Sequence, residues 1–245
     1  MTKELKFLID IVKEASKIIT DEFEVKAKDD KGDLVTNFDY EVEQFIINKI
    51  KKEYPTFTII SEEFNTNEEL TDNCFTIDPI DGTINFANKL PLWGIQVACI
   101  KDGKTCAAVI YLPKLNEFYY ADENGAFMND KRISVNNMKP DRGLYSVEGE
   151  GNTLIEYKMK KINNNYRNFY CAAANFSFVA SGKLSATCFV WHTLWDYIPG
   201  IYIVEKAGGV VYNDKKRHIA ANNKEFLNVL IENSDIDNDS SLSTL

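Results

Sequence analysis

Residues 77–86 read IDPIDGTINF, and this stretch decides how the rest of the chain is interpreted. The apolar residues before it predict a short buried strand over residues 74–77 that ends at the first aspartate. Pro79 holds the residue before it in extended geometry and has no N–H to donate to a neighbouring strand. Gly82 permits a tight turn, and Thr83 is suited to begin a short helix.

Two carboxylates, Asp78 and Asp81, are therefore expected where a strand ends and a helix begins. Carboxylates are ligands for hard cations, and the N–H groups at a helix N-terminus attract anions. This combination suits a phosphate group held by metal ions. Asp and Gly beside Pro are also ordinary turn residues, so the stretch by itself leaves a purely structural interpretation open.

Composition limits the class of protein. The chain has 245 residues, enough for one large domain or two tightly packed halves, and its hydrophobic fraction of 44% is usual for a soluble globular protein. The net charge of −9 argues against a nucleic-acid-binding protein, because phosphate backbones are bound by Lys and Arg. No apolar run approaches the length that crosses a bilayer, and no secretory leader is recognisable, so we expect no membrane association.

The cysteines and histidines do not favour a zinc site. The five cysteines are scattered, mostly within apolar runs, without a CxxC pair, which predicts reduced thiols in a cytoplasmic protein. The two histidines, His192 and His218, are too few for an imidazole-based metal centre. His192 is close to Asp196 in the sequence and could line a pocket, but we favour a packed or surface role.

Residues 1–136 are predicted to form an α+β half. Apolar spacing predicts a first helix over residues 5–23 and a second helix that ends near Tyr54. Glu62 and Glu63 follow a predicted strand; paired glutamates are common on solvated surfaces, yet these stand at a strand end, as the aspartates do. A polar loop is predicted over residues 26–32, strands over 57–60, 117–121 and 133–135, and a hairpin over 93–112.

Residues 137–232 are predicted to form a layered α/β half, followed by a polar tail over residues 233–245. Asp196 is placed to cap a helix that runs through Ile203 and stops at Gly208. A capping role alone would also explain this aspartate. Strands are predicted over residues 144–147, 166–171, 187–190, 210–212 and 226–231, and helices over 154–162 and 172–180.

Four motifs occur in order along the chain: DLVTxxD at 33–39, the glutamate pair at 62–63, DPIDGTxNF at 78–86 and WDxxxGxxxxxxAGG at 195–209. Together they resemble the inositol monophosphatase family over roughly residues 5–232. Members of that family are magnesium-dependent, often lithium-sensitive phosphatases that usually form homodimers. The resemblance implies an α/β (α+β) fold, a layered αβαβα sandwich of the inositol monophosphatase or sugar phosphatase type.

The chemistry of phosphate monoester hydrolysis agrees with such residues. The reaction needs a water molecule made nucleophilic near neutral pH, and neutralisation of charge on the phosphoryl oxygens. Two hard cations ~3.5–4 Å apart supply both. Mg²⁺ prefers oxygen ligands, so carboxylates suit it better than His or Cys. We therefore expect two or three Mg²⁺ ions as cofactor, Li⁺ as an inhibitor, and a small phosphate monoester as substrate.

The resemblance implies the following metal ligands. Glu62, Asp78 and the Ile80 carbonyl would hold a first ion, and Asp78 would bridge to a second ion bound by Asp81 and Asp196. These ligands come from three of the four motifs. We expect that Asp81→Asn or Asp196→Asn abolishes turnover while the fold survives.

The resemblance also implies the catalytic residues. Thr83 and Asp39 match a hydrogen-bonded pair of the family, and Thr83 with Glu62 would orient the attacking water. The N–H groups of Gly82 and Thr83 would hold phosphate oxygens. Glu63 would help to hold these residues in place without itself contacting the metal or the substrate.

Substrate choice is left open by one departure from the family pattern. Asp81 and Asp196 would also contact the substrate, but Phe189 stands where inositol-preferring members carry an acidic residue that binds a ring hydroxyl. A phenylalanine suits a flatter or more apolar leaving group. Fructose 1,6-bisphosphate, a nucleotide 3′-phosphate and the 2′-phosphate of NADP all remain admissible. The chain also departs from the family pattern at four other positions, none of which is an expected metal ligand: Ile84, Ile198, Pro199 and Lys206.

Two other classes of protein were weighed. A haloacid-dehalogenase-type phosphatase would carry a DxD motif after its first strand, whereas Asp78 and Asp81 are three residues apart and far from the N-terminus. A non-catalytic relative that binds phosphate or metal would keep the same ligands. Failure to turn over a broad panel of phosphate esters would favour that second alternative.

Overall fold

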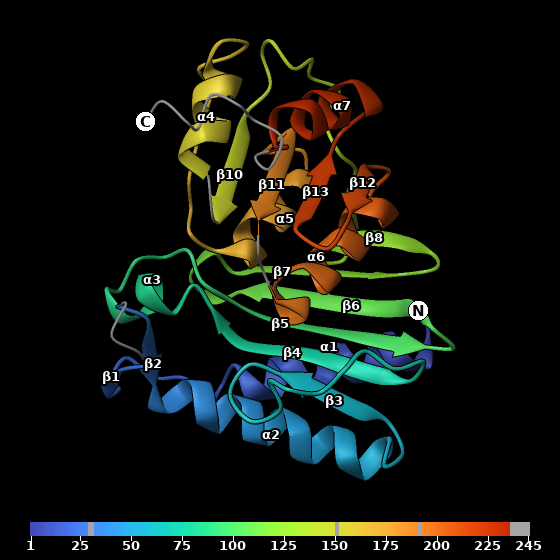
Figure 1. Cartoon of the computed structure of the whole chain (residues 1–245). Coiled ribbons are helices and arrows are strands. Elements are labelled where there is room, and N and C mark those ends of the chain that lie inside the picture. The colour runs from blue at the N-terminus through green and yellow to red at the C-terminus, as the bar shows by residue number, and fades with distance from the viewer. Residues whose placement is uncertain (29–31, 150–151, 191–192, 236–245) are drawn as a thin grey trace.

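The computed structural model describes residues 1–28, 32–149, 152–190 and 193–235, and these form a layered α/β protein (Figure 1). Helices α1 (Lys3–Ala15) and α2 (Asn37–Glu53) cover one face of a seven-stranded sheet, and α5 (Ala172–Ala180) and α6 (Leu194–Lys206) cover the other. A four-stranded sheet packs on the far side of α5 and α6, and α4 and α7 cover its outer face. The predicted αβαβα sandwich is confirmed.

The seven-stranded sheet has the order β3-β4-β5-β6-β7-β8-β9. Strands β3 and β4 are parallel, so their carboxyl ends lie at the same edge, and the remaining neighbours are antiparallel. The predicted hairpin over residues 93–112 is confirmed as β5 and β6. The strands are β3 (Thr58–Ser61), β4 (Cys74–Asp81), β5 (Gly94–Lys101), β6 (Lys104–Leu112), β7 (Glu117–Asp122), β8 (Gly125–Met128) and β9 (Lys131–Arg132).

The prediction that the central strand ends at residue 77 is wrong, since β4 continues through both aspartates to Asp81. Its pairing with β5 is irregular between Asp78 and Asp81, and Pro79 falls inside this interruption. The missing N–H of the proline is tolerated because the ladder is already broken there. The strand therefore carries the two acids, separated by a short irregular segment.

The short helix after the strand is confirmed as α3 (Thr83–Ala87). Gly82 precedes it with a φ of +79°, in the left-handed region that favours glycine. A Cβ at this position would lie 3.1 Å from the Leu92 carbonyl oxygen and 3.2 Å from the Cys171 Cβ. Glycine here lets the end of β4 turn directly into the helix.

The first helix is shorter than predicted. Helix α1 (Lys3–Ala15) ends before Ile18, Ile19 and Phe23, which pack instead against a separate cluster around Phe38 and Phe86. Helix α2 (Asn37–Glu53) ends beside Tyr54, as expected. The predicted loop over residues 26–32 overlaps β1 (Val25–Ala27), which pairs with β2 (Leu34–Thr36), and its residues 29–31 lie outside the described residues.

The four-stranded sheet has the order β10-β11-β13-β12, with β10 and β11 parallel. Two predicted strands are wrong. Residues 166–171 contribute only an isolated bridge between Tyr166 and Tyr145, and residues 226–231 lie in α7 (Lys224–Asn233). Asn223 caps that helix by accepting the Phe226 N–H at 2.9 Å. The strands are β10 (Tyr145–Gly149), β11 (Ala186–Val190), β12 (Val210–Asn213) and β13 (Arg217–Ala221), the last of which was not predicted.

One further predicted strand is wrong. Residues 133–135 form no strand, and the Val135 N–H donates to the Ala207 carbonyl at the end of α6. The strand that pairs with β7 is β8, which begins at Gly125. The remaining helices are α4 (Asn152–Lys160), α5 (Ala172–Ala180), α6 (Leu194–Lys206) and the short 3₁₀ helix η1 (Pro113–Leu115).

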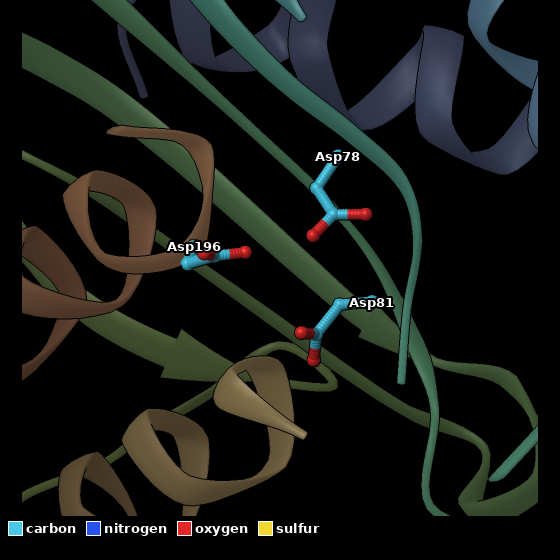
Figure 2. A group of neighbouring side chains, drawn as sticks. All are labelled: Asp78, Asp81 and Asp196. Carbon is cyan, nitrogen blue, oxygen red and sulfur yellow. The ribbon is translucent and has the colours of Figure 1, made fainter. Parts of the chain in front are cut away.

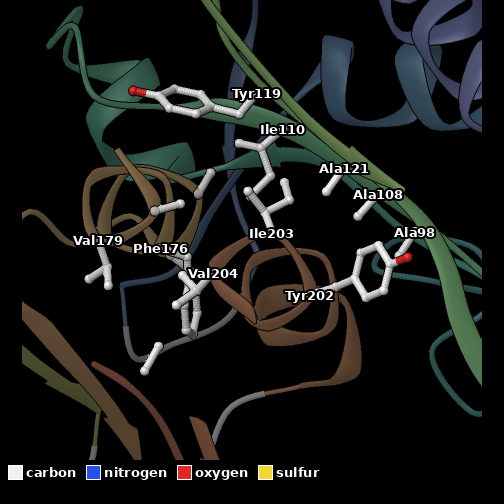
Figure 3. Close-up of a cluster of buried hydrophobic side chains, with 14 of the residues drawn as sticks. Ala98, Ala108, Ile110, Tyr119, Ala121, Phe176, Val179, Tyr202, Ile203 and Val204 are labelled. Carbon is white, nitrogen blue, oxygen red and sulfur yellow. The ribbon is translucent and has the colours of Figure 1, made fainter. Parts of the chain in front are cut away.

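The middle helical layer joins the two sheets through one core (Figure 3). Alanines of β5, β6 and β7 present small side chains to α6, which lets Ile203 and Tyr202 approach the sheet. Gly200 of α6 packs directly on Phe176 of α5, where a Cβ would lie 2.3 Å from the ring. This packing fixes the start of α6 over the end of β4. None of the helices in the described ranges is both long and apolar enough to cross a membrane.

Candidate active site

The end of β4 and the first turn of α6 bring three aspartates together (Figure 2). Asp78, Asp81 and Asp196 each offer a carboxylate oxygen, and these oxygens lie within 4.8 Å of one another. Thr193, and not Asp196, is the N-cap of α6. The Asp196 carboxylate completes the capping box by accepting the Thr193 N–H at 3.0 Å and its hydroxyl at 2.8 Å.

The two aspartates of β4 are buried, whereas Asp196 is partly exposed. Asp78 is 1% exposed and Asp81 is 7% exposed. Burial, and then the charges of Glu62 and Asp81, raise the pKa of Asp78 well above its ordinary value. Burial, and then the charge of Asp196, raise the pKa of Asp81 to about 7. The Oδ1 atom of Asp78 has no hydrogen-bond partner among the described residues.

The N-terminus of α5 points at Asp81. The Oδ2 atom of this carboxylate accepts the Cys171 thiol at 2.8 Å and the Ala173 N–H at 2.7 Å, and Oδ1 accepts the Ala172 N–H at 3.2 Å. Burial and the neighbouring Asp81 raise the pKa of the Cys171 thiol, which keeps it protonated as a donor. The sequence predicted Cys171 only as a reduced core residue. Its position directly before an alanine-rich helix was the signal of an N-cap.

Glu62 lines the same cavity as the aspartates but pairs with a lysine. The Lys28 Nζ lies 2.9 Å from the Glu62 Oε1 and 2.6 Å from the Glu63 Oε1. Burial raises the pKa of Glu62 to about 8, although Lys28 opposes the shift. Burial lowers the pKa of Lys28, but the charges of the two glutamates outweigh it and raise that pKa. Lys28 was not singled out from the sequence, where it stands in a polar loop.

A buried acid on α2 holds the segment that carries the glutamates. The Glu43 carboxylate accepts the Ser61 hydroxyl at 2.6 Å and the N–H groups of Glu63 and Phe64 at 2.8 Å each. Glu43 is fully buried, and burial raises its pKa. The sequence interpretation missed this residue. The available signal was a carboxylate beside Val42, on the face of α2 that packs against the sheet.

Thr83 lies between two acceptors at the start of α3. Its Oγ1 is 2.9 Å from the Ile80 carbonyl oxygen and 3.4 Å from the Asp39 Oδ1. The other Asp39 oxygen accepts the Thr36 N–H at 2.7 Å and hydroxyl at 2.5 Å. Burial raises the pKa of Asp39 to about 6. Gln96, also missed from the sequence, has its Nε2 3.4 Å from the Asp78 Oδ2.

A cavity of about 520 Å³ opens over these groups. Phe189 forms part of its wall, is 1% exposed and stacks on Phe176 with ring centroids 5.1 Å apart. His192 lies outside the described residues, and His218 is buried against the ring of Tyr197. The residues lining the cavity are Asp33, Glu62, Asp78, Ile80, Asp81, Gly82, Thr83, Ile84, Asn85, Glu148, Gly149, Tyr170, Cys171, Ala172, Phe189 and Asp196.

The donor set fits a hard cation. The three aspartates offer only oxygen ligands, and an unpaired oxygen of Asp78 is buried among like charges. Such a group is costly unless it is protonated or paired with a cation. Magnesium prefers these ligands, whereas zinc and copper sites use His and Cys. The nearby thiol of Cys171 is turned to Asp81 as a hydrogen-bond donor.

Comparison with known proteins agrees with this geometry. The sequence profile of the inositol monophosphatase family matches residues 1–237. Fructose-1,6-bisphosphatase/inositol-1-monophosphatase of Thermotoga maritima is 32% identical over 210 residues, which are 83% of this chain and 80% of that protein. Nus factor SuhB of Pasteurella multocida is 35% identical over 191 residues, 74% of this chain and 72% of that protein.

The same similarity extends to a solved structure. An inositol monophosphatase of Thermotoga maritima superposes with a TM-score of 0.84 at 30% identity and covers 95% of this chain and 98% of its own. Motifs, fold, acidic cluster and relatives agree across nearly the whole chain. The chain therefore belongs to the inositol monophosphatase family, and it is a phosphatase of that family.

Proposed function

We propose that this phosphatase is a Mg²⁺-dependent phosphomonoesterase that hydrolyses a small phosphorylated metabolite of the inositol monophosphate type. The observation that carries the proposal is the trio of aspartates, two of them buried, with an unpaired Asp78 oxygen, in the lining of a cavity large enough for a metabolite. A cluster of like charges in this place is stabilised by a cation.

The proposed metal ligands are the carboxylates of Glu62, Asp78, Asp81 and Asp196 and the carbonyl of Ile80. Two or three Mg²⁺ ions are expected, with Li⁺ as an inhibitor. Bound there, Mg²⁺ neutralises phosphoryl charge and acidifies a water molecule. Two observations support these ligands. All of their donor atoms are oxygens, and all five residues line the same cavity.

The proposed catalytic residues are Thr83, Asp39 and Glu62. In the proposed reaction, the attacking water gives a proton to the Thr83 oxygen while the Thr83 hydroxyl proton passes to the Asp39 carboxylate, which lies 3.4 Å away. The nearer acceptor of that hydroxyl, the Ile80 carbonyl at 2.9 Å, is the one assigned to the metal. Glu62 orients the same water from the neighbouring carboxyl end of β3. The N–H groups of Gly82 and Thr83 bind phosphate oxygens, and Glu63 acts indirectly by holding Lys28 beside Glu62.

The substrate remains a choice among a few phosphate esters. The name of the Thermotoga maritima relative supports inositol 1-phosphate and fructose 1,6-bisphosphate. A nucleotide 3′-phosphate and the 2′-phosphate of NADP are alternatives because Phe189 lines the wall. Asp81 and Asp196 are proposed to contact the substrate as well as the metal.

One relative favours a second candidate function. SuhB is named as a Nus factor, and it matches most of this chain. A non-catalytic protein that binds phosphate or metal would retain the same acidic cluster. Tight Mg²⁺ binding without turnover would support this alternative.

The proposal also covers the oligomeric state of the protein and its location in the cell. We propose a homodimer that acts in the cytoplasm, with residues 1–136 and 137–232 forming one catalytic unit. The contribution of both segments to the cavity supports a single unit. The free thiols of the five cysteines are in keeping with a reducing compartment.

The test is phosphate release with Mg²⁺ from inositol 1-phosphate, fructose 1,6-bisphosphate, 3′-phosphoadenosine 5′-phosphate and NADP. We expect turnover of at least one ester, its loss in EDTA and its inhibition by Li⁺. The absence of phosphate release from the whole panel, with Mg²⁺ binding intact, would overturn the proposed phosphomonoesterase activity. It would favour the non-catalytic protein that binds phosphate or metal.

A further inference from the structure

The wall of the cavity away from the aspartates is apolar and partly exposed. Ile84 and Tyr170 line it and are 51% and 67% exposed, and Phe189 lines it as a buried residue. A group of exposed apolar side chains rimmed by polar residues is typical of a ligand-binding groove. This wall faces the part of a substrate that lies beyond its phosphate.

Tyr170 has an unusual backbone conformation. Its φ is +48°, in the left-handed region that glycine, asparagine and aspartate adopt far more readily than tyrosine. Its N–H donates to the Glu148 Oε1 at 2.8 Å and to the Asn168 Oδ1 at 3.2 Å. A disfavoured conformation that the surrounding hydrogen bonds hold in place, at the edge of a site, indicates a function for the side chain.

The groups that hold Tyr170 are themselves fixed. Glu148 is 4% exposed, and its Oε1 also accepts the Asn175 Nδ2 at 2.6 Å. Glu148 lies on β10 directly opposite Phe189 on β11. From the other side, the Asn85 Nδ2 donates to the Tyr170 carbonyl at 3.4 Å, next to Ile84 on α3. The backbone of Tyr170 is thereby held by residues next to Ile84 and Phe189, and its side chain lines the cavity with them.

Two polar side-chain atoms beside this wall, the Glu148 Oε1 and the Asn85 Nδ2, already have several partners within the protein. The Glu148 Oε1 accepts three N–H groups, and the Asn85 Nδ2 donates to the Leu92 and Phe169 carbonyls at 2.8 Å each. A polyol would find few partners here beyond those it shares with the metal ligands. A planar ring would be covered by apolar and aromatic surface. The cavity of about 520 Å³ is within the range, ~300–1,000 Å³, of sites that enclose ligands of drug or nucleotide size.

We propose that Tyr170 is a specificity-determining residue whose ring stacks on a planar leaving group, so that the protein prefers nucleoside phosphates to polyol phosphates. This inference rests on the proposed phosphatase function and, among the phosphate esters considered there, favours the nucleotides over inositol 1-phosphate. Stacking is suited to this task because every nucleobase has a π-face, and the fixed backbone of Tyr170 reduces the entropy lost on binding.

The experiment compares adenosine 3′-monophosphate with glycerol 2-phosphate as substrates of wild type and of variants at Tyr170. Tyr170→Asn removes the ring and tolerates the left-handed backbone, and Tyr170→Phe keeps the ring. Tyr157→Asn is the matched control, since Tyr157 is 62% exposed on α4, and it should change neither substrate. We expect the ratio of kcat/KM for the nucleotide to that for glycerol phosphate to fall about 10-fold in Tyr170→Asn and to be kept in Tyr170→Phe.

A second readout does not depend on turnover. Saturation-transfer NMR with free adenosine should show transfer to the base protons in wild type and Tyr170→Phe, and its loss in Tyr170→Asn. An unchanged substrate ratio and unchanged transfer in Tyr170→Asn would overturn the stacking inference alone. Loss of transfer in Tyr170→Asn, with no phosphate release by wild type from these two esters or from the four esters of the activity panel, would uphold stacking and overturn the proposed phosphatase reaction.

Discussion

The carboxyl ends of β3 and β4 lie side by side, and both are followed or lined by acids that are buried or partly buried, but these acids are balanced in different ways. Glu62 and Glu63, after β3, share Lys28 as a built-in cation. Asp78 and Asp81, at the end of β4, are balanced only by N–H, thiol and amide donors, and one Asp78 oxygen has none among the described residues. The first group shares one internal cation between two acids, whereas the second has only neutral donors beside it and fits an external cation.

The largest expected effect follows from removing one charge at the β4 end. Asp81→Asn keeps the shape of the side chain and its place beside α5 but removes a proposed metal ligand. We expect turnover to fall on the order of 1,000-fold or more, with little change in Tm, because charge stabilisation in the transition state is lost. Steady-state phosphate release and thermal unfolding in EDTA measure both quantities. Near-normal Mg²⁺-dependent activity would contradict the assignment.

The thiol beside Asp81 gives a smaller effect. Cys171→Val removes the donor to the carboxylate and leaves a buried oxygen with fewer partners, which costs about 1–3 kcal/mol. We expect kcat to fall about 10-fold or more, whereas Cys171→Ser keeps a donor and most of the activity. Equal activity in the two variants would show that the Cys171 hydrogen bond does not position Asp81.

The pH dependence of stability distinguishes the metal-free from the metal-bound site. Burial raises the pKa of Asp39 to about 6, that of Asp81 to about 7 and that of Glu62 to about 8. The folded protein therefore binds more protons than the unfolded chain in this range, so stability in EDTA should fall as the pH rises from about 5 to about 8. Mg²⁺ favours the ionised acids and should raise Tm most at the upper end. A Tm in EDTA that rises over the same range would contradict the burial of these acids.

The smallest effect is expected at the β3 end. Lys28→Met removes the cation that pairs with Glu62, so we expect the Mg²⁺ concentration for half-maximal activity to fall a few-fold and the metal-free protein to lose about 1–3 kcal/mol of stability. Lys26→Met, a change at a lysine whose side chain is 74% exposed, is the control. If both variants require the same Mg²⁺ concentration as wild type, Lys28 and the metal do not compete for Glu62.

Much of the architecture could be predicted because it depends on local patterns. The apolar spacing of α2, the Asp-Gly turn between β5 and β6 and the motif around Asp78 are all contained within short stretches. The trio of aspartates could be anticipated only through the resemblance to a family, since Asp196 comes from a helix far along the chain. Nothing in its local sequence distinguishes a ligand from a helix cap.

The errors arose where tertiary contacts override local preference. Residues 226–231 read as a strand because they are apolar, but the cap at Asn223 and packing on β13 make them helical. Residues 133–135 alternate like a strand, yet they bond to the end of α6. Lys28, Glu43 and Cys171 were missed because each acts on a partner from another element, and single-sequence patterns do not record such pairs.

The central claim is that the aspartates at the end of β4 and the start of α6 form a site for a hard divalent cation. The most direct measurement is Mn²⁺ binding by electron paramagnetic resonance, with Mg²⁺ as competitor, in wild type and Asp78→Asn. We predict saturable Mn²⁺ binding that Mg²⁺ displaces, and its loss in Asp78→Asn with the fold intact. Equal Mn²⁺ binding in both proteins, or none in wild type, would contradict the claim.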